Sequence, residues 1–322
     1  MPHKRRVLLT VGPGLVEGRR CMTQRSLATA LDKVAELFVL PAGGYDFGND
    51  LVHAYRRVRG GRFEDCGMIA PEAELWIVYS DGYYVDHRAL GFRRQRDFFD
   101  AQIAFHQRQR ARGNVARVIN DPTVEARTLK SWLSTVDADR HRVIPTQLCA
   151  SMDALRDFRD EYGEVVAKPI WGSAGTGVWR LASEADVLAF GNQLEGSGNE
   201  QLSDYCFQPY VRGAEKRMWF AGGRFVAGRT IRGRPTPWSD RSADYDVRAY
   251  DERSEGFFAD LEAAEHLCQL SGLNVGAIDF IGDRINEING CGTVFTEYKG
   301  WQCVVDARPA LVGYFTELLR SA

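Results

Sequence analysis

Apolar runs and amphipathic stretches alternate along the first third of the chain. Residues 7–11 form an apolar, β-branched run, residues 25–35 carry leucine and valine at helical spacing, and residues 37–41 are apolar again. This order of strand, helix and strand predicts a parallel sheet with helices on its faces, and therefore an α/β fold. A further buried strand is expected at residues 75–79, followed by a long helix over residues 92–112.

The loop that follows the strand at residues 75–79 is polar and aromatic. It contains Asp81, Tyr83 and Tyr84. In open α/β sheets ligands gather at the carboxyl ends of the strands, so these three side chains are candidates for contacts with a small substrate. The alternative is a loop whose tyrosines only pack against the rest of the protein.

An Asn-Asp-Pro break at residues 120–122 separates this part from the middle of the chain. Helical spacing predicts one helix over residues 123–133, and Ser151 predicts the N-cap of another helix that ends near Gly163. Because the proline interrupts regular structure, we place a domain boundary there, after an N-terminal α/β domain of residues 1–119.

A glycine-rich loop lies between two apolar stretches at residues 165–168 and 178–181, and Lys168 directly precedes it. The loop includes Gly172, Ser173, Ala174 and Gly175. Glycine lets backbone N–H groups approach and surround phosphate oxygens, and the lysine adds a movable positive charge. The P-loop motif has its lysine after the last glycine, so this would be a phosphate loop of another kind. An ordinary hairpin with a flexible tip is the alternative.

The alternation of apolar and polar positions is clearest at residues 277–289, which predict two strands joined by a Gly-Asp turn. Strand side chains repeat every second residue, so Glu287 and Asn289 share a face, whereas Arg284, Asn286 and Glu287 cannot all share one. The hairpin would bring Asp279 opposite the first pair. Two carboxylates and an amide oxygen at one point suit Mg²⁺. The alternative is a surface hairpin with solvated acids.

The remaining elements follow from the same patterns. We expect a strand at residues 205–211, a hairpin over a Gly-Gly turn at residues 218–228 and a polar lid loop at residues 239–248. An amphipathic helix is expected at residues 259–270 and a terminal helix near residues 311–319.

Composition narrows the class of protein. The chain has 322 residues, of which 44% are hydrophobic and 26% charged, and its net charge is −2. These values are typical of a globular protein and give no reason to expect nucleic acid or a membrane as a partner. The seven cysteines are scattered without metal-ligand spacing, which favours reduced thiols and a cytoplasmic location.

Taken together, these motifs resemble the ATP-grasp superfamily, and within it the ligases similar to bacterial glutathione synthetase and to the ribosomal-protein glutamate ligase group. Residues 120–130 resemble the segment with the first nucleotide lysine, and residues 166–175 resemble the second lysine with its phosphate-covering loop. Residues 208–217 resemble the adenine- and ribose-binding linker. Residues 278–289 resemble the metal-binding end almost residue for residue.

The resemblance implies an architecture and a set of ligands. After the N-terminal domain it implies a central ATP-grasp subdomain, residues 120–204, and a C-terminal subdomain with the metal site, residues 205–322. ATP would be bound by Lys130, Lys168, Gly172, Ser173, Ala174, Gly175, Gln208, Tyr210, Val211 and Glu215. The metal, two Mg²⁺ ions with Mn²⁺ as a substitute, would be held by Asp279, Glu287 and Asn289. The catalytic arginines would be Arg217 and Arg232.

The activity implied is ligation of a carboxylate donor to an amine acceptor through an acyl phosphate, on amino-acid-sized molecules. A peptide- or protein-modifying ligase is an alternative, as are a small-molecule kinase and a non-catalytic nucleotide-binding module. The intact lysines and acids argue against the last, and the ligase-like hairpin argues against the kinase. Residues 290–295 and the stretch after Arg232 depart from the family pattern, so the resemblance does not extend to the substrates. A homo-oligomer, dimer or tetramer, is left open.

Overall fold

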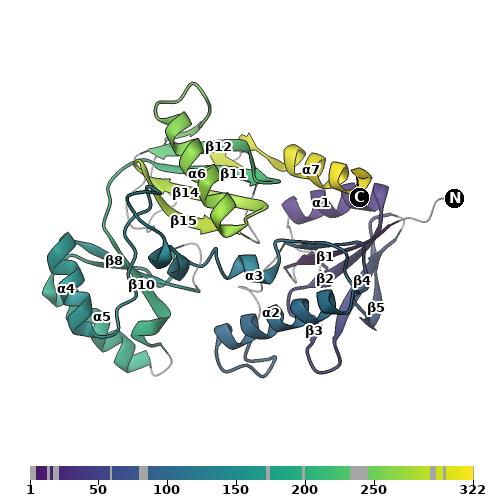
Figure 1. Cartoon of the computed structure of the whole chain (residues 1–322), viewed down its shortest axis with the longest axis horizontal. Coiled ribbons are helices and arrows are strands. Elements are labelled where there is room, and N and C mark those ends of the chain that lie inside the picture. The colour runs from purple at the N-terminus through teal and green to yellow at the C-terminus, as the bar shows by residue number, and fades with distance from the viewer. Residues whose placement is uncertain are drawn as a thin grey trace.

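The computed structural model describes most of the chain. The described residues are 5–12, 15–16, 22–58, 60–79, 86–171, 175–197, 200–232, 246–290, 295–299 and 302–321. Figure 1 shows three groups of strands and helices, with the N-terminal part at one side, the helices α4 and α5 at the other, and the strands β11, β12, β14 and β15 between and above them.

The N-terminal part is built on a seven-stranded sheet. Its parallel core, in the spatial order β2-β1-β6-β7, consists of β1 (Arg6–Val11), β2 (Glu36–Pro41), β6 (Leu75–Val78) and β7 (Val118–Ile119). An antiparallel extension beside β2 consists of β3 (Tyr45–Asp46), β4 (Leu51–Arg57) and β5 (Phe63–Ile69). The helices are α1 (Met22–Val34) and α2 (Gln95–Ala111). The predicted parallel sheet is confirmed; its apolar strands are buried because helices cover it.

The middle part is a three-stranded antiparallel sheet with two helices. Its elements are α4 (Met152–Tyr162), β8 (Val165–Pro169), β9 (Trp179–Leu181), α5 (Glu184–Ser197), η3 (Leu202–Asp204) and β10 (Tyr205–Pro209). Ser151 caps α4 by accepting a hydrogen bond from the backbone N–H of Ala154, and Gly163 ends the helix at φ 81°. Both helix ends are therefore where the sequence predicts them.

The C-terminal part is a five-stranded antiparallel sheet in the order β13-β12-β11-β14-β15. Its elements are β11 (Glu215–Ala221), β12 (Arg224–Arg232), β13 (Asp246–Ala249), α6 (Phe257–Ser271), β14 (Val275–Ile281) and β15 (Arg284–Asn289). Apolar side chains of one face, such as Met218 and Phe280, pack with α6. The other face carries the apolar side chains of Trp219 and Ala277. Two positions along the same strands, this face carries Arg217 and Asp279. Strand alternation thus gives one sheet an apolar face and a face that becomes polar toward the candidate site.

The chain ends in the hairpin β16 (Thr296–Lys299) and β17 (Gln302–Asp306) and the helix α7 (Arg308–Ser321). Helix α7 lies beside α1 (Figure 1). One core of buried side chains joins α1 and the parallel sheet to β11, β14 and α7, so the first and last parts of the chain share their apolar interior. The proposed boundaries at residues 119 and 204 stay predictions.

Two expectations for local structure are wrong. Residues 123–133 do not form one helix but a short helix, α3 (Pro122–Glu125), and a 3-10 turn, η2 (Lys130–Thr135). The interruption arises because Leu129 is extended, at φ −62° and ψ 143°. The second wrong expectation is that the polar lid loop extends to residue 248, because residues 246–248 belong to strand β13. Residues 239–245 lie outside the described part.

No helix among the described residues is both long and apolar enough to cross a bilayer.

Candidate active site

The strands β14 and β15 bring the predicted metal ligands together. Asp279 lies directly opposite Glu287 in the ladder. The side-chain amide of Asn289 is 2.9 Å from Oδ2 of Asp279 and 3.5 Å from Oε1 of Glu287. The predicted convergence of these three side chains is therefore confirmed; metal binding itself stays a prediction.

A β-bulge adds a fourth polar residue to this group. The register shifts between Asp279 and Phe280, which pair with Glu287 and Ile285, so Asn286 is the extra residue. Ile285 and Ile288 consequently both pack with the core beneath α6. The expected separation of Arg284, Asn286 and Glu287 assumes regular alternation, and the bulge interrupts that alternation at Asn286.

Arg217 neutralises Asp279 across two adjacent strands. The two residues are register partners in β11 and β14, and both guanidinium–carboxylate distances, Nε to Oδ1 and Nη2 to Oδ2, are 2.6 Å. Burial raises the pKa of Asp279, but the charge and hydrogen bonds of Arg217 outweigh burial, so this pKa lies below its usual range. Asp279 is 4% exposed and remains a carboxylate near neutral pH.

Lys168 reaches this group from the neighbouring sheet. Its buried ammonium donates to the side-chain oxygen of Gln208 and, at 2.5 Å, to that of Asn286. Burial lowers the pKa of Lys168, and Glu287 opposes the effect. Gln208 is fixed in turn because its amide donates to Thr146 Oγ1 at 2.9 Å and to the carbonyl of Asn286 at 3.2 Å.

Lys130 is the second cation of the site. Its Nζ is 3.9 Å from Oε2 of Glu287, and its side chain is 14% exposed. The two predicted lysines and the two predicted carboxylates therefore meet where β8 and β10 approach β14 and β15.

The remaining predicted residues that the structure describes make contacts outside this group of lysines and carboxylates. Glu215 accepts a hydrogen bond from the buried Arg229 at 2.7 Å. The ring of Tyr210, just beyond β10, lies under the guanidinium of Arg180, 4.4 Å from the ring centroid, and Val211 follows it. Arg232 is exposed at the end of β12. Gly175 has φ 74°, a conformation that favours glycine.

Several predicted residues lie outside the described part of the chain. These are Asp81, Tyr83, Tyr84, Gly172, Ser173 and Ala174. Their roles stay predictions.

Sequence reasoning missed Asn286 and Thr146. Asn286 stands beside Glu287 in the motif, but only the bulge turns it toward Lys168. Thr146 precedes α4 by several residues and meets Gln208 through an isolated bridge at Gln147–Phe207. No spacing in the sequence marks either contact.

The donor set fits a hard cation such as Mg²⁺. Glu287 is partly exposed, and each carboxylate oxygen has more than one lone pair, so the contacts to Arg217 leave acceptor capacity on Asp279. Rotation of the Asn289 amide about its last bond would present its oxygen. Among the described residues no group of three His, Cys, Asp or Glu side chains could hold a metal, so any site here depends on the amide and on ligand or water oxygens.

The fold and the site define an ATP-grasp protein. The family model for the ATP-grasp domain of prokaryotic glutathione synthetase matches residues 136–296, which is half of the chain. The chain belongs to this family.

Individual relatives agree with this assignment. The chain is 28% identical over 178 residues to glutathione synthetase of Bordetella parapertussis, covering 49% of this chain and 51% of the relative. It is 29% identical over 180 residues to glutathione synthetase of Parasynechococcus marenigrum, covering 54% and 56%. The aligned region thus spans about half the length of these curated relatives.

Solved structures resemble the whole chain in fold. The ATP-grasp ligase PsnB in complex with a precursor variant, Mg and ADP has a TM-score of 0.62 at 17% identity, covering 98% of this chain and 99% of that one. D-alanyl-alanine synthetase A of Vibrio cholerae has a TM-score of 0.59 at 11% identity, covering 100% and 99%. At these identities the likeness concerns the fold alone.

Proposed function

We propose that this protein is an ATP-dependent ligase that joins a carboxylate to an amine through an acyl phosphate, releasing ADP and phosphate. The observation that carries the proposal is the meeting of Lys130 and Lys168 with Asp279, Glu287 and Asn289 between two antiparallel sheets. Phosphoryl transfer depends on positioning and charge neutralisation, and this arrangement provides cations for phosphate oxygens and oxygen ligands for a metal.

Each side chain has a proposed part in this reaction. Lys130, Lys168 and Arg232 offset negative charge on the transferring phosphoryl group. Asp279, Glu287 and Asn289 would hold Mg²⁺, which when bound would supply positive charge to the phosphate groups. Arg217 holds Asp279 in place and anionic, which makes it a positioning residue first; contact with a donor carboxylate or phosphate is its second proposed role.

The remaining predicted residues are assigned to substrates. Gln208, Tyr210, Val211 and Glu215 would bind the adenosine part of ATP, and residues 172–175 would cover its phosphates. Asp81, Tyr83 and Tyr84 would contact an amino-acid-sized donor.

A peptide substrate is the second candidate, and a specific feature favours it. A groove of about 820 Å³ lies between α2 and the middle sheet and reaches Leu129, Ser131 and Pro169, which are neighbours of the two site lysines. Among the proteins of similar fold, PsnB and the macrocyclase MdnC were solved with precursor peptides. The groove is larger than a single amino acid requires.

Product formation tests the ligase proposal. The protein is incubated with ATP, Mg²⁺ and pooled amino acids, and ADP and phosphate are measured together with new amide products by mass spectrometry. We expect ADP formation that requires both Mg²⁺ and a carboxylate donor. A phosphorylated hydroxyl compound as the stable product would instead identify a kinase, and no nucleotide turnover with any donor, free or peptidic, would contradict the proposal.

Lys168→Ala is expected to weaken ATP binding. A hydrogen bond to a charged group contributes about 1.5–3 kcal/mol, so the Kd for a non-hydrolysable ATP analogue should rise about tenfold to a hundredfold. Calorimetric titration measures this Kd. Lys33→Ala, which removes an exposed lysine from the last turn of α1, is the matched control and should leave it unchanged. An unchanged Kd in folded Lys168→Ala would mean that Lys168 only joins the two sheets through Gln208 and Asn286.

A further inference from the structure

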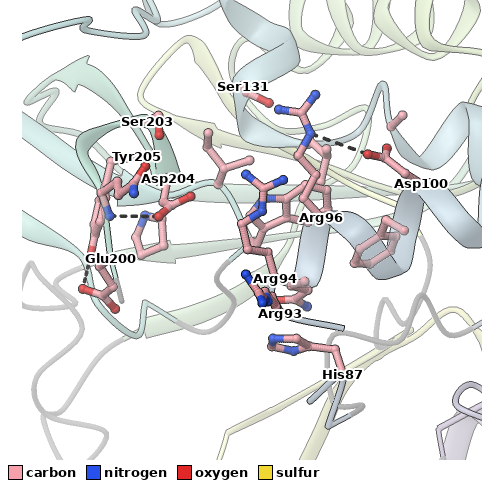
Figure 2. Close-up of a pocket in the computed structure, with 18 of the residues that line it drawn as sticks. His87, Arg93, Arg94, Arg96, Asp100, Ser131, Glu200, Ser203, Asp204 and Tyr205 are labelled. Carbon is pink, nitrogen blue, oxygen red and sulfur yellow. Dashed lines mark hydrogen bonds and ion pairs between the residues drawn. The ribbon is translucent and has the colours of Figure 1, made fainter. Parts of the chain in front are cut away.

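The groove between α2 and the middle sheet has two walls of different charge. One wall comes from residues 87–103 and the other from residues 193–205, and residues 169–171 contribute to the floor. Figure 2 shows Arg93, Arg94 and Arg96 of the first wall on one side, with Glu200, Asp204 and Tyr205 of the second wall opposite them. Lys168 and Glu287 do not line this groove, but Leu129, Ser131 and Pro169, the neighbours of the two site lysines, do, so the groove borders the candidate active site.

The first wall carries more positive charge than its own carboxylates neutralise. Arg94 pairs with Asp97 at 2.8 Å, and Arg96 lies 3.7 Å from Asp100. Arg88 and Arg93 are exposed, and neither side chain has an ion-pair partner within the described ranges. Arginine is suited to carboxylate and phosphate groups because its planar fork can donate two parallel hydrogen bonds.

The second wall does not supply the missing partners. Glu200 accepts a hydrogen bond from the hydroxyl of Tyr205 at 3.0 Å, and Asp204 accepts one from the backbone N–H of Gln201 at 2.9 Å. No ion pair crosses the groove among the residues that the structure describes. These acids are thus held by their own segment, and both line the groove. The hydrogen bond and the charge of Asp97, and to a smaller extent the charge of Asp204 across the groove, raise the pKa of Arg94.

The floor is apolar and leads toward the predicted phosphate loop. Phe99 of α2 stacks on Trp171 with ring centroids 4.8 Å apart and an interplanar angle of 24°. Ile170 and Leu129 extend this surface. Trp171 directly precedes Gly172, and Lys168 is three positions earlier. A ligand on the floor would therefore touch the segment that joins β8 to the glycine loop.

We propose that this groove binds an acidic peptide segment, with side-chain carboxylates on Arg88 and Arg93 and apolar side chains on Trp171, which the buried Phe99 supports. A compact polyanion fits less well, because Glu200 and Asp204 would repel it from the opposite wall. An extended peptide can turn its carboxylates toward the arginines and its backbone N–H groups toward those acids. The groove volume is near the upper end of the range for drug-sized ligands, roughly 300–1,000 Å³, which suits several residues.

This inference rests on the proposed function in one respect: the peptide segment is taken to be part of the substrate. The segment would bind at a distance from the carboxylate that reacts. Binding energy gained at such a remote part can position the reacting group. Peptide binding needs no ATP, so it is measured independently of turnover.

Fluorescence anisotropy tests the proposal without nucleotide. The probe is a fluorescein-labelled hexapeptide that alternates glutamate with alanine and phenylalanine, and its comparison peptide has lysine in place of glutamate. We expect saturable binding of the acidic peptide alone. Arg88→Ala/Arg93→Ala should raise the Kd at least about tenfold, because two charge-assisted contacts are lost. Arg62→Ala/Arg224→Ala removes the same charge from exposed positions far from the groove and should leave the Kd unchanged.

Three results would overturn the proposal. They are equal binding of the acidic and basic peptides, an unchanged Kd in Arg88→Ala/Arg93→Ala, and displacement of the peptide by citrate at matched concentration, which would identify a small-anion site. Both arginines are exposed, and the midpoint of thermal unfolding verifies that the variant is folded. If the protein binds the peptide but forms no ADP, the proposed ligase function is contradicted and the proposed peptide-binding groove is not.

Discussion

Glu287→Gln is expected to abolish Mg²⁺-dependent ADP formation while the protein stays folded. Glu287 lies opposite Asp279, is partly exposed and has Lys130 as its nearby cation, so it is the carboxylate of the hairpin that is best placed to meet a metal. Glutamine keeps the shape of the side chain but removes the charge. Loss of one preorganised electrostatic contact typically lowers turnover about a hundredfold to a thousandfold, and Asn289→Ala should behave in the same way.

The measurement is the initial rate of ADP release as a function of Mg²⁺ concentration, with far-ultraviolet circular dichroism as a check on folding. Asp283→Asn is the matched control, since it removes an acid from the turn of the same hairpin whose side chain is 80% exposed. Its rate should equal that of the parent protein. Full activity of Glu287→Gln would show that the metal lies elsewhere.

Much of this hairpin could be predicted from sequence because its determinants are local. Alternating polarity, a Gly-Asp turn and an acid at the centre of an apolar strand give the register of Asp279 against Glu287. The same holds for α4, where Ser151 and Gly163 mark both ends. Local chemistry also explains the Gly222-Gly223 turn, because both glycines have positive φ.

What could not be predicted depends on contacts between distant segments. The bulge at Asn286 is a feature of strand pairing, and the amide that it aims at Lys168 comes from 118 positions along the chain. The resemblance implies that Arg217 is a catalytic arginine, yet its side chain pairs with Asp279, a contact that arises only when β11 and β14 pair. The groove arises in the same way, since its walls are at least ninety residues apart in sequence.

The first and last parts of the chain also pack together, and this contact makes the domain boundaries hard to predict from sequence. A proline break suggests a boundary at residue 120, and composition gives no sign that α1 packs beside α7. Asn120 itself bonds both the carbonyl and the N–H of Val275, at 2.7 and 3.1 Å. The break is therefore also a point where two parts of the fold are joined.

Arg217→Met is expected to lower the free energy of unfolding by about 3–5 kcal/mol, the usual cost of leaving a buried charge without its partner. The guanidinium and the carboxylate of Asp279 are 20% and 6% exposed, and both of their contacts are 2.6 Å long. The double variant Arg217→Met/Asp279→Leu should recover a large part of this loss, because it removes both charges together. Urea denaturation without Mg²⁺ gives the four free energies of the cycle.

The pH dependence of the same cycle separates charge pairing from packing. The folded pKa of Asp279 is depressed, so its contribution to stability is present above its unfolded pKa of about 3.9 and is lost as pH falls through the folded pKa. The difference in unfolding free energy between the parent protein and Asp279→Asn should therefore be constant near neutral pH and shrink as pH falls below about 4. A difference that does not change with pH would mean that Asp279 acts through shape alone. Arg217 would then be free to serve a ligand, as the family resemblance implies.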